Sequence, residues 1–210
     1  MATSKSKQPV DTNTEEKIRK AARVVFHKKG FAATRTRDIA EEANINLALL
    51  NYYFRSKEKL FELIMLETIA TFLQNMGTIF NDENTTLAKK IELVAEKYID
   101  QLIAEPEMPI FVMSEVRSNG GKILEKLPVV NSVMQSAFIK QYKQAVANGE
   151  IAVANPLHFV MNIMGLVVFP FVNSPLIKKA GKVSDAQFTQ LMKERKKLVP
   201  VWIQAMLKAG

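Results

Sequence analysis

The chain has 210 residues, of which 48% are hydrophobic and 24% are charged, and it contains no cysteine. This length suits one large domain, or a small domain followed by a larger one, with enough apolar residues for a substantial core. The lack of cysteine excludes disulfides, thiolate catalysis and cysteine-ligated zinc, and it suits a reducing cytoplasm. Residues 1–13 show no apolar signal sequence, and the longest apolar run, 159–172, is shorter than the ~20 residues of a membrane span. We therefore expect a soluble, cytoplasmic protein with no membrane partner.

The formal net charge of +8 is concentrated near the N-terminus. Residues 1–60 contain 13 Lys and Arg against 7 Asp and Glu, whereas residues 61–210 contain 16 against 14. A basic excess confined to one segment is typical of a surface that binds phosphates. The charge distribution thus favours nucleic acid as a partner of the N-terminal segment.

The first predicted helix begins near Asn13, which forms a capping pair with Glu16. Gly30 predicts its end, and Phe31 is expected to pack back on Phe26. Between these ends the apolar residues recur at helical spacing, at Ile18, Ala21, Ala22, Val25 and Phe26. This segment therefore reads as an amphipathic helix.

Two short helices joined by a tight turn follow within residues 34–54. Asn44 stands where the chain must turn sharply, and Asn tolerates a left-handed backbone better than most residues. Ile45 is expected to be buried in the turn, and Asn46 is a good N-cap for the second helix, in which Leu50 and Phe54 face inward. Helix, short turn, helix is the arrangement that lays a recognition helix into the major groove of DNA.

A fourth helix is predicted from the cap Ser56 to about Phe80. At ~1.5 Å per residue its length is about 37 Å, which is too long for a small N-terminal domain alone. We expect it to extend into the rest of the protein and to couple the two halves. Further helices are predicted over 87–103, 110–118, 129–147, 157–169 and 185–207, with a turn at 119–121. Asn155-Pro156 and the Ser184–Gln187 capping box predict the starts of the last two.

Residues 30–60 resemble the DNA-binding domain of the tetracycline-repressor (TetR) family, and the match covers about the first third of the chain. The motif is carried by Gly30-Phe31, Thr34, Thr36-Arg37-Asp38-Ile39-Ala40, Ala43-Asn44-Ile45-Asn46, Leu50, Tyr52-Tyr53-Phe54, Ser56-Lys57-Glu58 and Leu60. The family usually has Gly at position 44, Tyr at 51 and a small or polar residue at 49. The resemblance implies an all-α fold of about nine helices. It places a three-helix helix-turn-helix domain over 11–71 and a larger helical ligand-binding and dimerisation domain over 72–210.

The resemblance also implies which residues contact DNA. The set expected at base edges and in the groove is Thr36, Arg37, Leu47, Ala48, Leu49 and Tyr52, and the set expected at phosphates is Thr34, Asn51, Tyr53 and Lys57. Arg37 is the candidate for a bidentate bond to guanine, and its alternative is a solvated side chain or a phosphate contact. Lys57 stands at a helix start, where a cation is disfavoured unless a phosphate binds there.

The C-terminal two thirds is rich in Met and aromatic residues, each of which on its own is a core residue by default. Together they can line an adaptable apolar cavity, and the resemblance implies a pocket for a small-molecule inducer. The pocket candidates are Phe72, Met76, Phe80, Tyr98, Phe111, Met113 and Phe138. The resemblance further implies a homodimer formed through the helices over 157–169 and 185–207.

Residues for catalysis or metal binding do not stand out. His27 and His158 have no ligand at metal-binding spacing, and Gly120-Gly121 lacks the Lys and Ser/Thr of a phosphate-binding loop. We expect no cofactor and no metal.

The predicted function is a DNA-binding transcriptional regulator, a repressor released from a palindromic operator by a small apolar or amphipathic ligand. The alternatives are a ligand-independent regulator of the same fold and, more remotely, a small helical enzyme.

Overall fold

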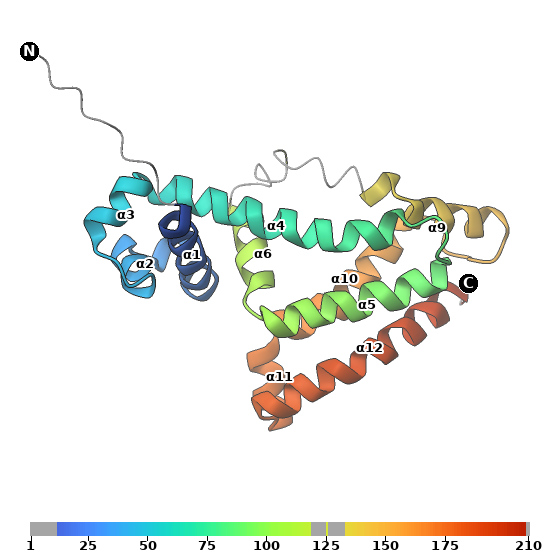
Figure 1. Ribbon diagram of the computed structural model, residues 1–210. Coiled ribbons are helices and arrows are strands. Elements are labelled where there is room, and N and C mark those ends of the chain that lie inside the picture. The colour runs from blue at the N-terminus through green and yellow to red at the C-terminus, as the bar shows by residue number, and fades with distance from the viewer. Residues whose placement is uncertain (1–11, 119–124, 126–132, 209–210) are drawn as a thin grey trace, which may run out of the picture. The chain divides into compact units, whose positions relative to one another are not determined.

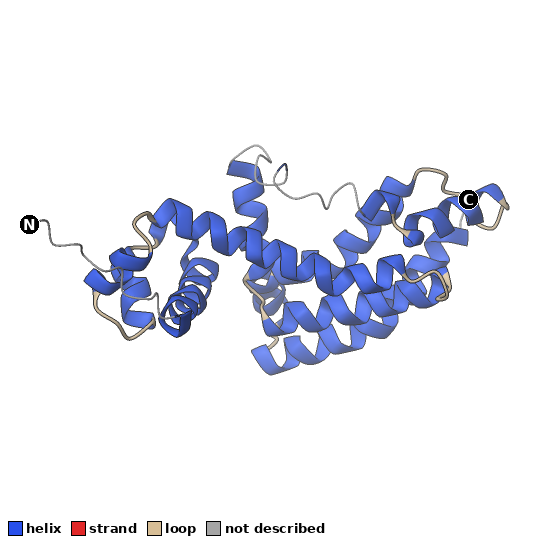
Figure 2. Ribbon diagram, turned by 45° about the horizontal axis from the view of Figure 1, so that its top comes forward, coloured by secondary structure: helices blue, strands red, loops and turns tan. Residues whose placement is uncertain are grey.

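The computed structural model describes residues 12–118, 125 and 133–208, and every regular element among them is a helix (Figures 1 and 2). The predicted all-α class is confirmed. The chain divides into two compact units, Met1–Glu67 and Thr68–Gly210. This division falls four residues before the expected domain boundary between 71 and 72.

Unit 1 contains α1 (Thr12–Ala33), α2 (Thr36–Glu42), α3 (Leu47–Tyr53) and the first part of α4 (Lys57–Asn81). The predicted apolar face of α1 is confirmed, because Ile18, Ala21, Ala22, Val25 and Phe26 are all buried. The predicted cap is wrong, since Asn13 already lies inside the helix. Gly30 has the positive φ of 70° expected at the helix end.

Phe31 packs on a ring that lies further along the chain. The described aromatic pairs place Phe26 and Phe31 on the same third ring, Phe61 of α4, at centroid distances of 5.0 and 4.9 Å. The end of α1 is therefore held by a ring 30 residues further along the chain, a contact that local spacing cannot reveal.

The turn between α2 and α3 has the predicted geometry. Asn44 adopts a left-handed φ of 50°, and the Asn46 side chain accepts the Leu49 N–H at 2.7 Å as the N-cap of α3. Leu50 is buried, whereas Ile45 and Phe54 are only half-buried. Asn44 and Asn46 together make the helix-turn-helix that the sequence predicted.

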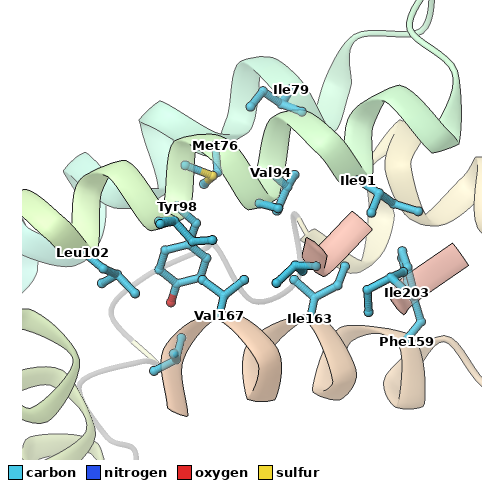
Figure 3. Packing of buried hydrophobic residues seen from close by; sticks show 14 of the residues in the cluster. Met76, Ile79, Ile91, Val94, Tyr98, Leu102, Phe159, Ile163, Val167 and Ile203 are labelled. Atoms are coloured by element: carbon cyan, nitrogen blue, oxygen red, sulfur yellow. The ribbon is translucent and has the colours of Figure 1, made fainter. Parts of the chain in front are cut away.

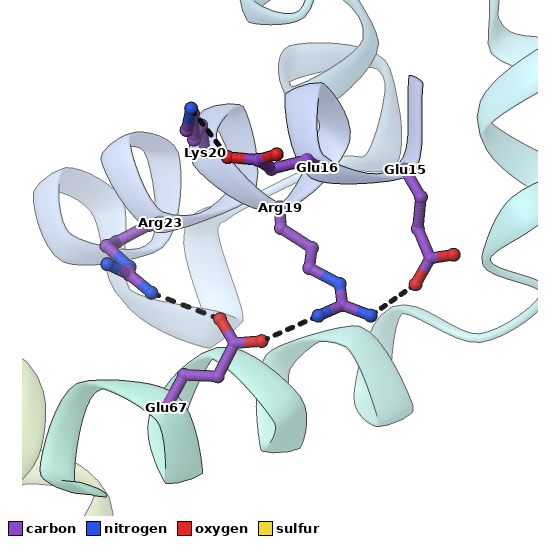
Figure 4. A network of polar contacts seen from close by, with 6 residues as sticks. All are labelled: Glu15, Glu16, Arg19, Lys20, Arg23 and Glu67. Carbon is purple, nitrogen blue, oxygen red and sulfur yellow. Dashed lines mark hydrogen bonds and ion pairs between the residues drawn. The ribbon is translucent and has the colours of Figure 1, made fainter. Parts of the chain in front are cut away.

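Charged side chains join α1 to the start of α4 within unit 1 (Figure 4). Glu67 accepts from Arg19 Nη1 through one oxygen and from Arg23 Nη2 through the other, each at 3.1 Å. Arg19 also pairs with Glu15 on its own helix. A carboxylate shared by two guanidinium groups forms a network, and networks stabilise more than isolated surface pairs.

In the part that the structure describes, unit 2 contains the rest of α4 and the following further helices. These are α5 (Leu87–Ala104), α6 (Met108–Ser118), α9 (Ala137–Ala147), α10 (Pro156–Val172), α11 (Ser174–Gly181) and α12 (Asp185–Lys208). α5 packs against both α10 and α12. Their facing side chains form an apolar core with the C-terminal part of α4, and Figure 3 shows Val94 and Tyr98 facing Ile163 and Val167.

Two predicted helix starts in unit 2 are confirmed. The Asn155 side chain accepts the Leu157 N–H at 2.9 Å, with Pro156 as the first helical residue of α10. Ser184 and Gln187 form the reciprocal capping box, in which the Gln187 N–H donates to Ser184 Oγ and the Ser184 N–H donates to Gln187 Oε1. Local side-chain bonds thus decide where the last two long helices begin.

Two predictions for unit 2 were incomplete. The helix expected over 129–147 is interrupted at Ser136: residues 133–135 and Ala137–Ala147 are helical, and Ser136 between them has an extended backbone and caps α9 by accepting the Ile139 N–H at 3.5 Å. Residues 129–132, like the turn expected at 119–121, lie outside the described residues. α11 was not predicted, although Pro175 in its first turn is a helix-start signal.

α10 contains Pro170, which has no N–H to donate to the carbonyl of Leu166 one turn earlier. Arg195 of α12 supplies the missing donor, since its Nη2 donates to Leu166 O at 2.6 Å. The same guanidinium lies 4.9 Å from the ring of Trp202. A side chain of α12 thus completes the backbone hydrogen bonding of α10.

Among the described helices, α4 is long and apolar enough to cross a membrane, and the bent pair α10 and α11 would pass together. The core helix of a soluble protein passes the same test. Leu60, Ile64 and Met65 of α4 are buried in unit 1 and Met76 is buried in unit 2, so α4 contributes apolar side chains to both cores.

Candidate nucleic-acid interface

α3 presents one exposed face. Leu50 anchors it inward, while Ala48, Asn51 and Tyr52 are exposed and Tyr52 keeps 57% of its surface free. Leu47, Leu49 and Tyr53 are half-buried at the rim of this face. The Tyr52 and Tyr53 rings meet edge to face at 5.4 Å, which restricts both side chains. The helix therefore offers a short, mostly apolar surface with one amide and two phenol groups.

The first turn of α2 supports an exposed arginine. Asp38 accepts the Arg35 N–H at 2.9 Å and pairs with Lys29 at 3.1 Å. These contacts, the backbone bond first, hold the pKa of Asp38 below its usual range. Arg37 is exposed and has no ion pair or hydrogen bond with other described residues. Thr36 is half-buried beside it. Arg37 is thus free to bond to a partner, as its predicted role requires.

Thr34 requires a correction. It is 2% exposed, and its hydroxyl donates to Gly30 O at 2.6 Å. This bond satisfies a carbonyl at the end of α1 and turns the side chain inward. The expected contact between the Thr34 side chain and a phosphate does not fit this position.

Lys57 has protein partners that the sequence did not suggest. Its Nζ donates to Phe31 O at 3.1 Å and to Thr34 O at 3.0 Å, and it lies 4.1 Å from the centroid of the Phe31 ring. The carbonyls offset the cost of placing a cation at the start of α4. An ammonium has three N–H donors, so one remains for a phosphate.

Two exposed cations near these helices were not singled out from the sequence. Arg35 precedes α2, and Arg55 lies between α3 and α4. The signal that pointed to them was the basic excess of residues 1–60. With Arg37 they give three exposed arginines on α2 and in the segments that flank α2 and α3.

The residues expected to line a ligand pocket mostly pack against one another in unit 2. Met76, Tyr98, Phe111 and Phe138 are buried. Phe72 lies 4.5 Å from Tyr98, and Phe80 stacks on Phe138 at 5.5 Å. Burial raises the pKa of the Tyr98 phenol, which therefore stays neutral. The rings of these two pairs thus contact one another within the apolar core of unit 2.

An open groove of about 500 Å³ lies along α6. Its walls are Ile110, Val112, Met113, Ser114, Val116, Arg117 and Val172. Met113, which is 54% exposed, is the residue that the groove shares with the predicted pocket set. The expected pocket residues are therefore not brought together around one cavity in the part of unit 2 that the structure describes.

The described residues hold no group of three or more His, Cys, Asp or Glu that could bind a metal. His27 is half-buried, and burial, with a smaller contribution from the charge of Arg23, lowers its pKa to about 4. His158 is exposed. Neither histidine is placed for metal or catalytic chemistry within the described chain.

Comparison with known proteins adds to this geometry. Residues 18–64, which span most of α1 to the start of α4, match the family model described as "Bacterial regulatory proteins, tetR family". The chain is 24% identical over 206 residues to the probable HTH-type transcriptional regulator YttP of Bacillus subtilis, covering 94% of this chain and 96% of that protein. It is 34% identical over 102 residues to the HTH-type transcriptional repressor NicS of Pseudomonas putida, covering 49% of this chain and 48% of that protein.

The fold is also found among solved structures. A bacterial regulatory protein in the tetR family from Rhodococcus RHA1 superposes with a TM-score of 0.71 at 18% identity. The alignment covers 95% of this chain and 99% of that one. The similarity thus extends over both units, beyond the segment that the family model matches.

Proposed function

This chain belongs to the TetR family of bacterial regulatory proteins, and on that premise we propose that it is a repressor released from its operator by a small apolar or amphipathic ligand. It is a DNA-binding transcriptional regulator. The repressor assignment is supported by its similarity to NicS, a transcriptional repressor, over about half the chain. Acting on DNA, it would work in the cytoplasm.

The observation that carries the proposal is the exposed face of α3 together with the exposed arginines Arg35, Arg37 and Arg55 on or beside α2 and α3. Ala48 and Tyr52 offer apolar surface suited to thymine methyl groups, with Leu47 and Leu49 beside them. Arg37 and Thr36 supply the polar groups for base edges. Asn51, Tyr53, Lys57, Arg35 and Arg55 would bind phosphates around them. The cations supply affinity for any duplex, and α3 with Arg37 supplies sequence preference.

A homodimer is supported by apolar side chains that unit 2 leaves exposed. On α10, Leu157, Met161 and Met164 lie at helical spacing on one face. On α12, Leu191, Leu198 and Val201 do the same, and the two helices pack against each other. An exposed apolar surface of this kind is typical of an association site. A two-fold dimer would read a palindromic operator with half-sites about 34–36 Å apart.

A second candidate is a regulator that needs no ligand. It is supported by ring contacts among four of the predicted pocket residues, since Phe80 stacks on Phe138 and Phe72 lies against Tyr98. Ligand release requires a ligand that binds the DNA-incompetent state better than the competent one. The two candidates therefore differ in whether any small molecule weakens operator binding.

Selection of DNA by the purified full chain tests the DNA-binding proposal. We expect enrichment of a palindrome, and we expect Arg37→Ala to relax the preference at one G·C pair, by roughly 1–3 kcal/mol of discrimination. Lys59→Ala, an exposed lysine of α4, is the matched control for loss of charge. Equal weakening on every sequence would assign Arg37 to the phosphates, and failure to enrich any sequence would contradict the proposed function.

A further inference from the structure

The helix α11 of unit 2 has no buried residue. It lies where α10 and α12 meet, and it is bent by 68° relative to α10 (Figure 1). Ile177 packs partly against the core of unit 2, and Lys178 pairs with Asp185 at the start of α12 at 2.8 Å. α11 is therefore held on unit 2 by one side, and its other sides face solvent.

The basic residues of unit 2 are concentrated in its C-terminal part. Residues 151–210 contain 8 Lys and Arg against 2 Asp and Glu, whereas residues 61–150 contain 8 against 12. Between 151 and 184 there is no acidic residue, and the three lysines of that stretch all lie on α11 or at its end. Two of them, Lys179 and Lys182, are exposed, and their side chains have no ion pair or hydrogen bond with other described residues. α11 thus carries two free cations.

An apolar side chain lies beside these cations. Leu176 is 65% exposed, more than any other large apolar side chain of the described residues. Because residues three and four positions apart are neighbours on a helix surface, Leu176 stands next to Lys179 and to the exposed Ala180. Lysine stems can lie along apolar surface while their ammonium groups stay in a polar layer. The exposed side of α11 is therefore amphipathic.

This combination fits an anionic lipid surface better than a nucleic acid or a protein. The outside of a duplex offers phosphates to the ammonium groups but no apolar partner to Leu176. The eight residues of α11 form a helix about 12 Å long, which is too short to supply the roughly 800 Å² that each side of a stable protein interface buries. A bilayer has anionic headgroups above an apolar layer, and it is fluid enough to adapt to a small helix.

We propose that α11 docks unit 2 on the surface of an anionic phospholipid bilayer. Leu176 enters the boundary between headgroups and acyl chains, while Lys179 and Lys182 bind the phosphates. The expectation of no membrane partner rested on the lack of a spanning segment, which a helix that lies in the interface does not need. The inference is independent of the DNA contacts proposed for α3, since α11 belongs to unit 2.

Co-sedimentation of the full chain with vesicles tests this site. One set of vesicles contains phosphatidylcholine alone, and the other contains equal parts of phosphatidylcholine and phosphatidylglycerol. We expect binding to the anionic set only. Binding should weaken with salt, which shortens the Debye length from about 10 Å at 0.1 M to about 3 Å at 1 M.

The α11 variants remove the cations and the apolar side chain separately. Lys179→Gln with Lys182→Asn should lower the partition coefficient about 25-fold, because each lysine near the surface contributes about 5-fold. Asn suits position 182 because Lys182 has a left-handed φ of 51°. Leu176→Gln changes no charge and should lower the coefficient by about 10-fold or more.

Matched variants elsewhere in the chain are the controls. Lys140→Gln with Lys143→Gln removes the same charge from exposed positions of α9, and Val24→Gln changes an exposed apolar residue of unit 1. Both should keep vesicle binding within about 2-fold. An equal loss in the two lysine pairs would show attraction by net charge alone and would overturn the proposal. Binding that survives the α11 variants would overturn it too, by assigning the contact to the basic segment 1–60.

The remaining outcomes identify other occupants of α11. All three α11 side chains are exposed, so the variants should melt with the wild type, and a large drop would assign these residues to the fold instead. Weaker operator binding by the α11 variants would make nucleic acid the partner, and loss of a dimer would make it a second copy of the chain. Each of these results would overturn the proposal, as would a wild type that ignores anionic vesicles.

Discussion

At the scale of single residues, Lys57 serves two purposes that can be separated. Its ammonium holds the backbone carbonyls of Phe31 and Thr34, and its third N–H is available to a phosphate. We expect Lys57→Ala to lower the stability of unit 1 by about 1–3 kcal/mol, the cost of bonds lost from a charged donor. It should also weaken binding to all DNA sequences and reduce the salt slope by about one. Denaturant titration and DNA titration at several salt concentrations measure the two effects. A lower stability with an unchanged slope would leave Lys57 with a purely structural role.

His27 makes the stability of unit 1 depend on pH. Its pKa is lowered from 6.5 to about 4 by burial and by Arg23, so the unfolded chain binds more protons between these values. Stability is therefore fully present above pH 6.5 and is lost as the pH falls toward 4. The loss should be on the order of 1–2 kcal/mol after allowance for partial exposure. Melting of wild type and His27→Gln across this pH window measures it, and a loss of equal size in both would assign the effect to other groups.

At the scale of elements, the contact between α1 and α4 in unit 1 depends on one carboxylate. Glu67 serves Arg19 and Arg23 together, and the Nε atoms of both arginines are buried without a partner among the described groups. We expect Glu67→Gln to destabilise unit 1 by about 1–2 kcal/mol, less than for a fully buried pair because the side chains are partly exposed. Added salt should reduce the difference from wild type. Glu42→Gln, at an exposed carboxylate of α2 in the same unit, is the control, and a difference that salt does not change would contradict an electrostatic origin.

The sequence predicted the start of a helix correctly where the capping side chain bonds a backbone N–H within the first turn of that helix. Asn46, Asn155 and Ser184 cap helices through bonds to residues two or three positions away. Asn44 forms the predicted turn through its own left-handed backbone conformation.

The residues of the candidate site were harder to predict. Thr34 faces inward and Lys57 holds two carbonyls because of contacts with α1, and the Lys57 partners lie more than 20 residues away. Four of the predicted pocket residues, Met76, Tyr98, Phe111 and Phe138, are buried as apolar spacing indicates, but spacing does not show whether they surround a cavity or one another.

At the scale of the whole molecule, the apolar faces of α10 and α12 predict the assembly state. Met161→Glu together with Val201→Glu would place charges on two side chains that are 57% and 61% exposed in the single chain. Neither change should affect the fold of the monomer, yet both should oppose a dimer. We expect wild type to sediment as a dimer at micromolar concentration and the double variant as a monomer with weaker operator binding. Val24→Glu, at a similarly exposed apolar residue of unit 1, should remain dimeric, and a wild type that sediments as a monomer would contradict the model.

The bond between Arg195 and the Leu166 carbonyl implies that positions 170 and 195 are inherited as a pair. Pro170 creates the free acceptor and Arg195 uses it, so the value of each residue depends on the identity of the other. Arg195→Met should cost about 1.5–3 kcal/mol beside Pro170, but much less in a Pro170→Ala background, where the alanine N–H can reach Leu166 O. A double-mutant cycle should therefore show a coupling of about 0.5–3 kcal/mol. Loss of Arg195, which is costly beside Pro170, should therefore be tolerated once position 170 is an alanine.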